Sequence, residues 1–190
     1  MNPNFEDIAE RIRTLREITG YTTEEMAVAT GVSVSEYEAL EQTSNDYSFT
    51  FLYRCAEKFG VDIIELITGE TPKLTGYTVV RANQGLRIKR NEQFEYYHLA
   101  ATFKNKLAEP FKVIAPYRPE EHSRPIELHS HEGQEFDFIL MGVLRFAYGT
   151  HMEDLYPGDS VYYDSSKGHG MIAMGGEECV FLAVVMKEPD

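Results

Sequence analysis

The fold of the second part of this chain is decided by the sequence HSHEGQE, which occupies residues 129–135 and is followed by a glycine at position 142. Residues two apart on a β-strand point to the same face, so His129 and His131 are predicted to point inward together. Glu135 begins the next apolar run, and a later segment leads to His169. Imidazoles with one carboxylate suit a divalent transition metal such as Fe, Zn, Mn or Ni. The pattern therefore predicts one such metal per chain, held by these four residues.

Short runs of alternating apolar and polar residues surround this motif from residue 77 onward, and glycine, proline or asparagine separates many of them. The runs cover residues 77–81, 86–90, 94–103, 111–115, 136–141 and 179–186. Many short strands at close spacing indicate a sandwich or a barrel. The second part of the chain is therefore predicted to be all-β.

The first part of the chain shows apolar residues at spacings of three and four, which mark one face of a helix. In the first helix these residues are Phe5, Ile8, Ile12, Leu15 and Ile18. Side chains that favour helix N-caps precede four further helices, and glycines follow most of these helices. The capping residues are Thr22 or Thr23, Ser33, Ser48 and Asp62. Residues 5–69 are therefore predicted to form a bundle of five short helices.

A segment without periodicity separates the two patterns. It has the sequence ETPKLTG at residues 70–76, and it contains both proline and glycine. We therefore predict a helical domain at residues 1–70, a linker at residues 71–76 and an all-β domain at residues 77–190.

The composition is that of a globular protein rather than a membrane or secreted one. Of the 190 residues, 43% are hydrophobic, which suffices for packed cores. No apolar run approaches the roughly 18 residues of a membrane span, and the charged N-terminus lacks the apolar segment of a secretory signal. The two cysteines, Cys55 and Cys179, fit a reducing compartment better than a disulfide framework. We therefore expect a cytoplasmic protein.

The predicted helices at residues 23–42 match the helix-turn-helix pattern, with Ala27 where two helices cross and Gly31 at the turn. With the flanking helices, residues 5–69 resemble the five-helix DNA-binding domains of the phage-repressor family (Cro/C1-type, XRE). In that family the second helix of the motif enters the major groove of DNA. The resemblance implies contacts to DNA from Ser33, Ser35 and Glu38, with Thr23 near the backbone.

The charge of this domain opposes such a role. Residues 1–70 carry 14 acidic and five basic side chains, a net charge of −9 within a chain of net charge −13. The second helix of the motif contains Glu36, Glu38 and Glu41 and no lysine or arginine. Because neutralisation of phosphates supplies much of the affinity of proteins for DNA, this helix would add repulsion. The alternative is a helical module that serves dimerisation or covers the second domain.

The all-β part, residues 77–187, resembles the cupin superfamily, whose barrel is a double-stranded β-helix. The four predicted metal ligands stand at the positions of the cupin ligands, and Gly142 and Gly158 also match the two cupin motifs. Other motif positions differ, because this chain has Ser123, Asp164, Ser166 and Ala173 where the family has glycine, proline, glycine and asparagine. Those positions shape turns, so the resemblance still implies a complete ligand set.

Aromatic residues in the strand runs are candidates for the wall of a ligand pocket. They are Phe136, Phe138, Phe146, Tyr162 and Phe181. In a small barrel such residues usually fill the core, and ligand pockets are also mostly apolar. The sequence leaves both interpretations open.

The domain order resembles that of bacterial regulators in which a cupin domain senses a small molecule and the helical domain binds an operator as a dimer. We therefore expect a DNA-binding transcriptional regulator that forms a homodimer and binds a metal and a small-molecule ligand. The same order occurs in 2-hydroxypropylphosphonate epoxidase, an iron enzyme whose helical domain supplies a catalytic lysine. Gly20 or Tyr21 stands in that place here. The alternative is therefore a mononuclear metal enzyme, an oxygenase or isomerase but not an epoxidase, whose helical domain does not bind DNA.

Overall fold

A computed structural model describes residues 5–42, 47–88 and 94–187 of the chain. These residues divide into two compact units. The helical unit contains residues 5–42, 47–78, 88 and 101–105, and the sheet unit contains residues 79–87, 94–100 and 106–187. No helix in these ranges combines the length and the apolar character that crossing a membrane requires.

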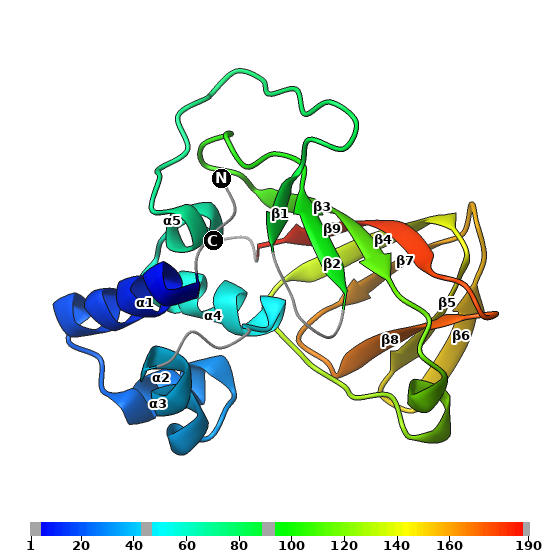
Figure 1. Cartoon of the computed structure of the whole chain (residues 1–190), viewed down its shortest axis with the longest axis horizontal. Helices are drawn as coiled ribbons and strands as arrows, with labels where there is room; N and C mark the ends of the chain where they lie inside the picture. The colour runs from blue at the N-terminus through cyan, green and yellow to red at the C-terminus, as the bar shows by residue number, and fades with distance from the viewer. Residues whose placement is uncertain (1–4, 43–46, 89–93, 188–190) are drawn as a thin grey trace. The chain divides into compact units, whose positions relative to one another are not determined.

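The helical unit consists of the five predicted helices (Figure 1). They are α1 (Phe5–Thr19), α2 (Thr23–Thr30), α3 (Val34–Gln42), α4 (Phe49–Phe59) and α5 (Ile63–Thr68). The side chains of Thr22, Ser48 and Asp62 accept hydrogen bonds from the first turns of α2, α4 and α5, so these predicted caps are confirmed. Ile18 differs from the prediction, because it is 76% exposed near the end of α1, beyond the buried part of the helix face.

A buried ion pair ties α1 to α3 inside the helical unit. The guanidinium of Arg16 donates from Nε and Nη2 to the two carboxylate oxygens of Glu41, at 2.6 and 3.0 Å. The hydroxyl of Tyr37 donates to the same carboxylate at 2.8 Å. Glu41 therefore faces inward although α3 is otherwise acidic on its exposed side, and a bidentate pair of this kind fixes the relative orientation of two helices.

The segment predicted as a linker is paired with a loop of the helical unit. The backbone N–H of Leu74 donates to the carbonyl of Thr102 at 3.0 Å, and Lys104 donates to the carbonyl of Leu74 at 2.7 Å. The predicted boundary at residues 71–76 stays a prediction. After it, segments of the two units alternate along the chain, because residues 88 and 101–105 belong to the helical unit.

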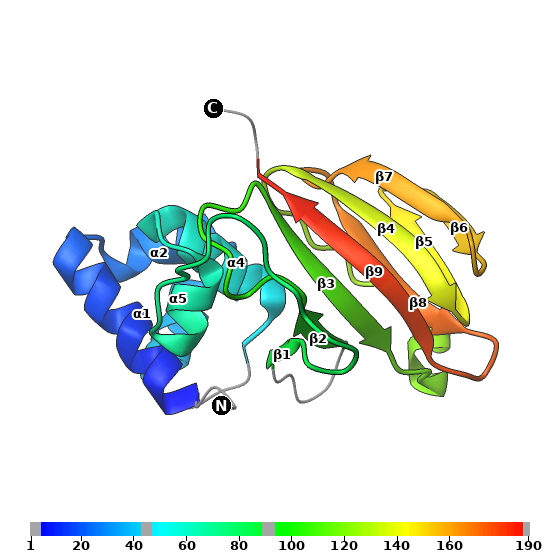
Figure 2. The same ribbon diagram turned by 90° about the horizontal axis from the view of Figure 1, so that it is seen from above.

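The sheet unit contains nine strands in two sheets (Figure 2). The strands are β1 (Leu86–Ile88), β2 (Glu95–His98), β3 (Ala108–Ala115), β4 (Gln134–Met141), β5 (Val143–Tyr148), β6 (His151–Leu155), β7 (Ser160–Asp164), β8 (His169–Met174) and β9 (Cys179–Met186). The larger sheet has the order β1-β2-β3-β9-β4-β7 and the smaller one has the order β6-β5-β8. Within the described residues the predicted barrel thus consists of two separate sheets. Among these residues no hydrogen-bonded ladder joins the two sheets into a closed barrel.

One predicted strand is absent. Residues 77–81 form no strand, and Tyr77 and Val79 are exposed. An alternating pattern without a neighbouring strand to supply hydrogen-bond partners does not make a strand.

Two central strands of the larger sheet, β3 and β4, alternate buried and less buried residues. In β3 the buried residues are Glu109, Phe111, Val113 and Ala115, and in β4 they include Glu135, Asp137 and Ile139. The inner face of the sheet therefore carries carboxyl groups among apolar side chains, which is the feature that positions the candidate site.

The ladder of β4 and β7 joins Phe138 to Ser160 and Glu135 to Tyr163 in antiparallel register. Past the strand ends the chain turns at residues 165–167, where Ser165 donates to the carbonyl of Gly133 at 3.1 Å and His131 donates to the carbonyl of Ser165 at 2.9 Å. Beyond this turn an isolated antiparallel bridge pairs His129 with His169 through two reciprocal backbone hydrogen bonds of 2.8 and 2.9 Å.

Gly133 lies within the segment of residues 129–135 and lets the end of β9 approach it closely. Its φ of +93° lies in the left-handed region, and a Cβ there would lie 2.0 Å from the carbonyl oxygen of Met186. We expect Gly133→Ala to lower the free energy of unfolding of the sheet unit by about 2 kcal/mol or more, because backbone strain adds to the displacement of β9. Urea denaturation followed by circular dichroism measures this change.

Gly175→Ala is the matched control, because Gly175 also has a positive φ, +80°, but no atom lies within 4 Å of its added Cβ. In this variant the free energy of unfolding should fall by about 1 kcal/mol, because only the backbone strain is added. Equal losses in the two variants would contradict the steric role of Gly133.

Candidate metal centre

Three of the four predicted ligands meet on the inner side of the sheet unit. One ligand atom each from His131, Glu135 and His169 lies within 4.8 Å of the others. The Nε2 atom of His131 is 3.3 Å from Oε2 of Glu135. All three residues are buried, with 6–8% of their surfaces exposed. Two imidazoles and one carboxylate are a donor set suited to a divalent transition metal.

Both histidines are held with their Nε2 atoms available. The Nδ1–H of His131 donates to the carbonyl of Glu132 at 3.0 Å, and the Nδ1–H of His169 donates to the carbonyl of Lys167 at 2.9 Å. A neutral imidazole whose Nδ1 carries the proton presents a lone pair at Nε2. Backbone carbonyls that fix the tautomer in this way are typical partners of metal-binding histidines.

The charges around the group favour an ionised Glu135 and a neutral His169. Burial alone would raise the pKa of Glu135, but the hydrogen bond and positive charge of His131 in its protonated form, aided by His169 and Tyr163, hold it below its usual value. Burial lowers the pKa of His169. Both directions favour the protonation states in which these side chains bind a metal.

His129, the fourth predicted ligand, stays a prediction. Its ring is 43% exposed, and its Nε2 lies 3.8 Å from Oε1 of Glu127. Its backbone is nevertheless paired directly with that of His169. Because paired residues of an antiparallel ladder point to the same face, His129 lies on the same side of the ladder as His169.

Two buried polar residues beside the group were not predicted from the sequence. Asp137 is fully buried and Tyr163 is 6% exposed, and the Tyr163 hydroxyl lies 3.3 Å from Oδ2 of Asp137. Burial, followed by the charge of Glu135, raises the pKa of Asp137 well above its usual value. The signal available in the sequence was an acidic residue two positions after Glu135, on the same face of an otherwise apolar strand.

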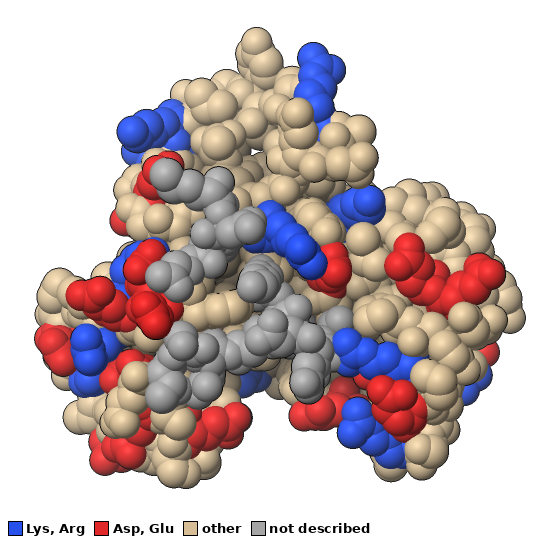
Figure 3. Space-filling view, in the orientation of Figure 1, with Lys and Arg blue, Asp and Glu red and all other residues tan. Residues whose placement is uncertain are grey.

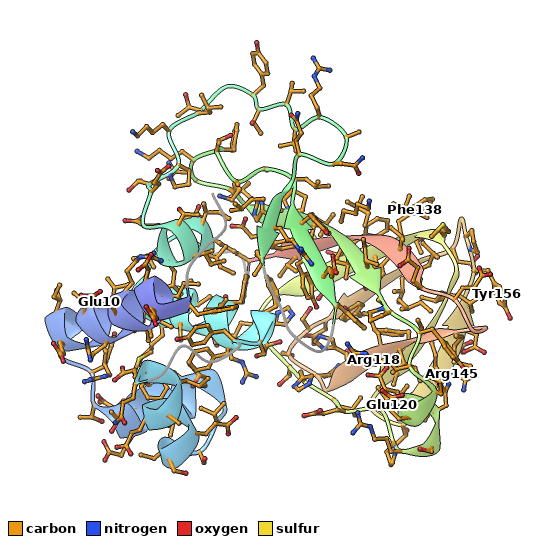
Figure 4. The ribbon with its side chains drawn as sticks, in the orientation of Figure 1. Glu10, Arg118, Glu120, Phe138, Arg145 and Tyr156 are labelled. Atoms are coloured by element: carbon orange, nitrogen blue, oxygen red, sulfur yellow. The ribbon has the colours of Figure 1, made fainter. Side chains whose placement is uncertain are left out.

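The five predicted pocket residues divide between the two faces of the sheets. Phe146 and Phe181 are buried, and the Phe146 ring lies 4.9 Å from that of Tyr163. The structure does not bring Phe136, Phe138 and Tyr162 to the group. They alternate with Glu135, Asp137 and Tyr163, so they point to the opposite face, where Tyr162 is 58% exposed and Phe138 lies at the periphery of the sheet unit (Figure 4).

The predicted DNA contacts lie at the start of α2 and on α3. Ser33, Ser35 and Glu38 are exposed, and Thr23 is half-buried. The hydroxyl of Ser33 already accepts a hydrogen bond from the backbone of Glu36 at 3.2 Å, as an N-cap does.

Most basic side chains of the helical unit stabilise its fold. Arg11 donates to the carbonyls of Leu66 and Ile67, Arg54 donates to the carbonyl of Thr30, and Arg16 pairs with Glu41. Lys58 lies over the ring of Tyr21, 4.3 Å from its centroid. The visible surface of this unit is accordingly rich in acidic side chains (Figure 3).

Comparison with known families identifies both parts of the chain. Residues 9–72 match the family described as a helix-turn-helix domain, and residues 117–185 match the family described as a cupin domain. The chain therefore joins a helix-turn-helix domain to a cupin domain, as the sequence predicted. No match is found among curated proteins.

Solved structures share this order of domains. An HTH_3 family transcriptional regulator from Vibrio cholerae is 18% identical, with 97% of each chain covered and a TM-score of 0.68. Hydroxypropylphosphonic acid epoxidase from S. wedmorenis is 20% identical, with 98% of this chain and 100% of that chain covered and a TM-score of 0.51. The FeII form of HppE is 21% identical, with 94% and 97% covered and the same TM-score. At these identities the similarity shows the fold.

We expect His131→Ala to strip most of the bound metal, because it removes one of three converging donors. His129→Ala should retain the metal with weaker affinity, since three buried donors remain. Plasma emission spectrometry of the dialysed proteins measures the stoichiometry. His151→Ala, which changes an exposed histidine of β6, is the control and should bind as the wild type does. Full stoichiometry in His131→Ala would exclude this site.

Proposed function

We propose that this protein is a DNA-binding transcriptional regulator whose cupin domain holds a divalent metal and senses a small molecule. The observation that carries the proposal is the helix-turn-helix domain at residues 9–72, joined to a cupin domain with a buried His131–Glu135–His169 group. The similarity to an HTH_3 family transcriptional regulator over 97% of both chains supports it.

In this proposal the metal is bound by His131, Glu135 and His169, with His129, whose backbone is paired with that of His169, as the fourth ligand. The metal would supply a Lewis-acidic centre to which a small molecule can attach. The protein contributes the fixed tautomers of the two histidines and a buried surrounding that includes Phe146 and Tyr163.

Sensing requires that the small molecule bind two states of the regulator with different affinity. In a homodimer the relevant states would be two placements of a pair of DNA-reading heads. Repressor-type domains read two half-sites about one helical turn apart, so a change in placement changes the fit to DNA.

The acidic surface limits how this domain could hold DNA. Helix N-termini and hydroxyl groups hold phosphates without a basic side chain, and Ser33 and Ser35 lie at the start of α3. Affinity from such contacts should be modest, because Glu36 and Glu38 on the same helix repel phosphates.

A second candidate function is a mononuclear metal enzyme of the oxygenase or isomerase type. Two observations favour it: the buried two-histidine, one-carboxylate group, which is the ligand set of non-haem iron oxygenases, and the acidic helical domain. The similarity to FeII HppE is consistent with it. In this case the helical domain would be a structural module.

The two candidates are separated by DNA binding. The metal-loaded protein, prepared without oxygen, is titrated at low salt against the DNA upstream of its own gene and against an unrelated fragment of equal length. A regulator should prefer the upstream fragment. Absence of binding to either fragment, with metal varied, would reject the regulator and direct the work to oxygen- and metal-dependent turnover.

Glu38→Lys tests whether α3 approaches DNA. We expect this variant to bind nonspecific DNA about tenfold more tightly at low salt, because a repulsive charge near the phosphates becomes an attractive one. Fluorescence anisotropy with a labelled duplex measures the affinity. Glu10→Lys makes the same charge change on α1, away from the motif (Figure 4), and should have a smaller effect. Equal effects in the two variants would show that only net charge matters.

We also expect a homodimer, because repressor-type heads read DNA in pairs. Sedimentation velocity at micromolar concentration should give twice the chain mass of 21.7 kDa. A monomer under these conditions would contradict the paired-head arrangement.

A further inference from the structure

We propose that Tyr163 is a positioning residue of the metal centre: its side chain, paired with Glu135 and anchored by its hydroxyl on Asp137, fixes Glu135 for metal binding. This inference rests on the metal-binding part of the proposed function. Neither Tyr163 nor Asp137 belongs to the ligand set.

The position of Tyr163 follows from the register of the larger sheet. Tyr163 on β7 pairs directly with Glu135 on β4, so the two side chains stand side by side on the inner face. Directly paired side chains have Cβ atoms roughly 4.5–5.5 Å apart. A tyrosine at this place reaches past the carboxylate of Glu135 toward the residue two positions further along β4, which is Asp137.

Tyr163 also touches a second ligand residue. Its ring centroid lies 4.9 Å from that of His169 and 4.9 Å from that of Phe146. The ring thus packs against Phe146 and one ligand while its hydroxyl reaches Asp137. One side chain therefore contacts two of the three residues that converge on the candidate metal position.

The hydroxyl of Tyr163 reaches the carboxyl group of Asp137. It donates to Oδ2 of Asp137 at 3.3 Å, which is long for a bond between two oxygen atoms. Because Tyr163 is paired directly with Glu135, its side chain passes beside Glu135 on the way to Asp137. Tyr163 is thus anchored at its tip by Asp137 while it lies alongside a ligand residue.

Asp137 is otherwise unexplained. It is fully buried, and its second carboxyl oxygen, Oδ1, has no hydrogen-bond partner among the described residues. Burying a carboxyl group in an apolar strand destabilises the fold, and more so where one oxygen lacks a hydrogen bond. We infer that Asp137 is kept here to anchor the Tyr163 hydroxyl beside Glu135, as polar groups behind metal ligands commonly do.

The test uses the full chain and Co(II) as the only ligand. Tyr163→Phe removes one oxygen atom and keeps the ring packed against Phe146 and His169. We expect its dissociation constant for Co(II), measured by calorimetry, to rise by roughly 10- to 100-fold, the usual effect of removing a group that orients a metal ligand. The visible absorption of bound Co(II) should also change, because the carboxylate is no longer fixed. A purely structural role would not alter this spectrum.

Tyr148→Phe is the matched control. The Tyr148 hydroxyl donates to the backbone carbonyl of Asp164 at 3.0 Å, and its ring lies 6.1 Å from that of Tyr163. This variant loses a hydroxyl close to the centre without touching a ligand carboxylate. Its Co(II) affinity and spectrum should stay those of the wild type.

Asp137→Asn separates anchoring from direct ligation. Asparagine keeps an oxygen that can accept from Tyr163, so affinity should fall less than in Tyr163→Phe. A larger fall would make Asp137 itself a ligand and overturn the proposal. The proposal would also be overturned if Tyr163→Phe kept the Co(II) affinity and spectrum of the wild type. In that case the metal site itself would still stand. If the wild type binds no Co(II), the metal-binding part of the proposed function fails as well.

Discussion

The antiparallel register of β4 with β7 is the constraint on which the candidate site depends. Side chains alternate along a strand, so a slip of one residue would turn Glu135 and Asp137 outward and bring Phe136 and Phe138 inward. Beyond the turn that follows β7, an isolated bridge brings the backbone of His169 to that of His129. Gly133, with its positive φ, lets β9 pass close to the motif without breaking the pairing.

The inner face of the larger sheet carries two buried polar clusters, and they differ in a way that indicates their roles. In the cluster of His98, Lys106 and Glu109, the Nδ1 atom of His98 accepts from the backbone of Ala100 at 2.9 Å, so its Nε2–H donates to Glu109 at 2.6 Å. Lys106 lies 3.7 Å from the same carboxylate. The polar groups of this cluster pair with one another, as buried polar groups in a purely structural cluster must. Around Glu135 both histidines instead use Nδ1 for backbone carbonyls and turn Nε2 toward a shared point.

In the helical domain the fold and the surface charge point in opposite directions with respect to DNA binding. Arginines at positions 11, 16 and 54 close helix ends or pair with Glu41, so the cations that a DNA reader would present are used inside the domain. The helix-turn-helix geometry does not need basic residues, because its core and caps are made by apolar side chains, hydroxyls and glycines. DNA affinity does need favourable charge. The fold therefore supports a regulator, whereas the surface makes any binding dependent on helix ends and hydroxyl groups.

The sequence by itself determined the five helices and their caps, most strands, the order of the two domains and the residue types of the metal group. These depend on local periodicity, capping side chains and spacing within one segment. Only the tertiary structure decided that residues 77–81 form no strand and that Phe136, Phe138 and Tyr162 face away from the group. It also decided that Tyr163 and Asp137 stand beside Glu135. The physical reason is that a strand needs a partner, and its inner face is defined only when the pairing register between distant segments is set.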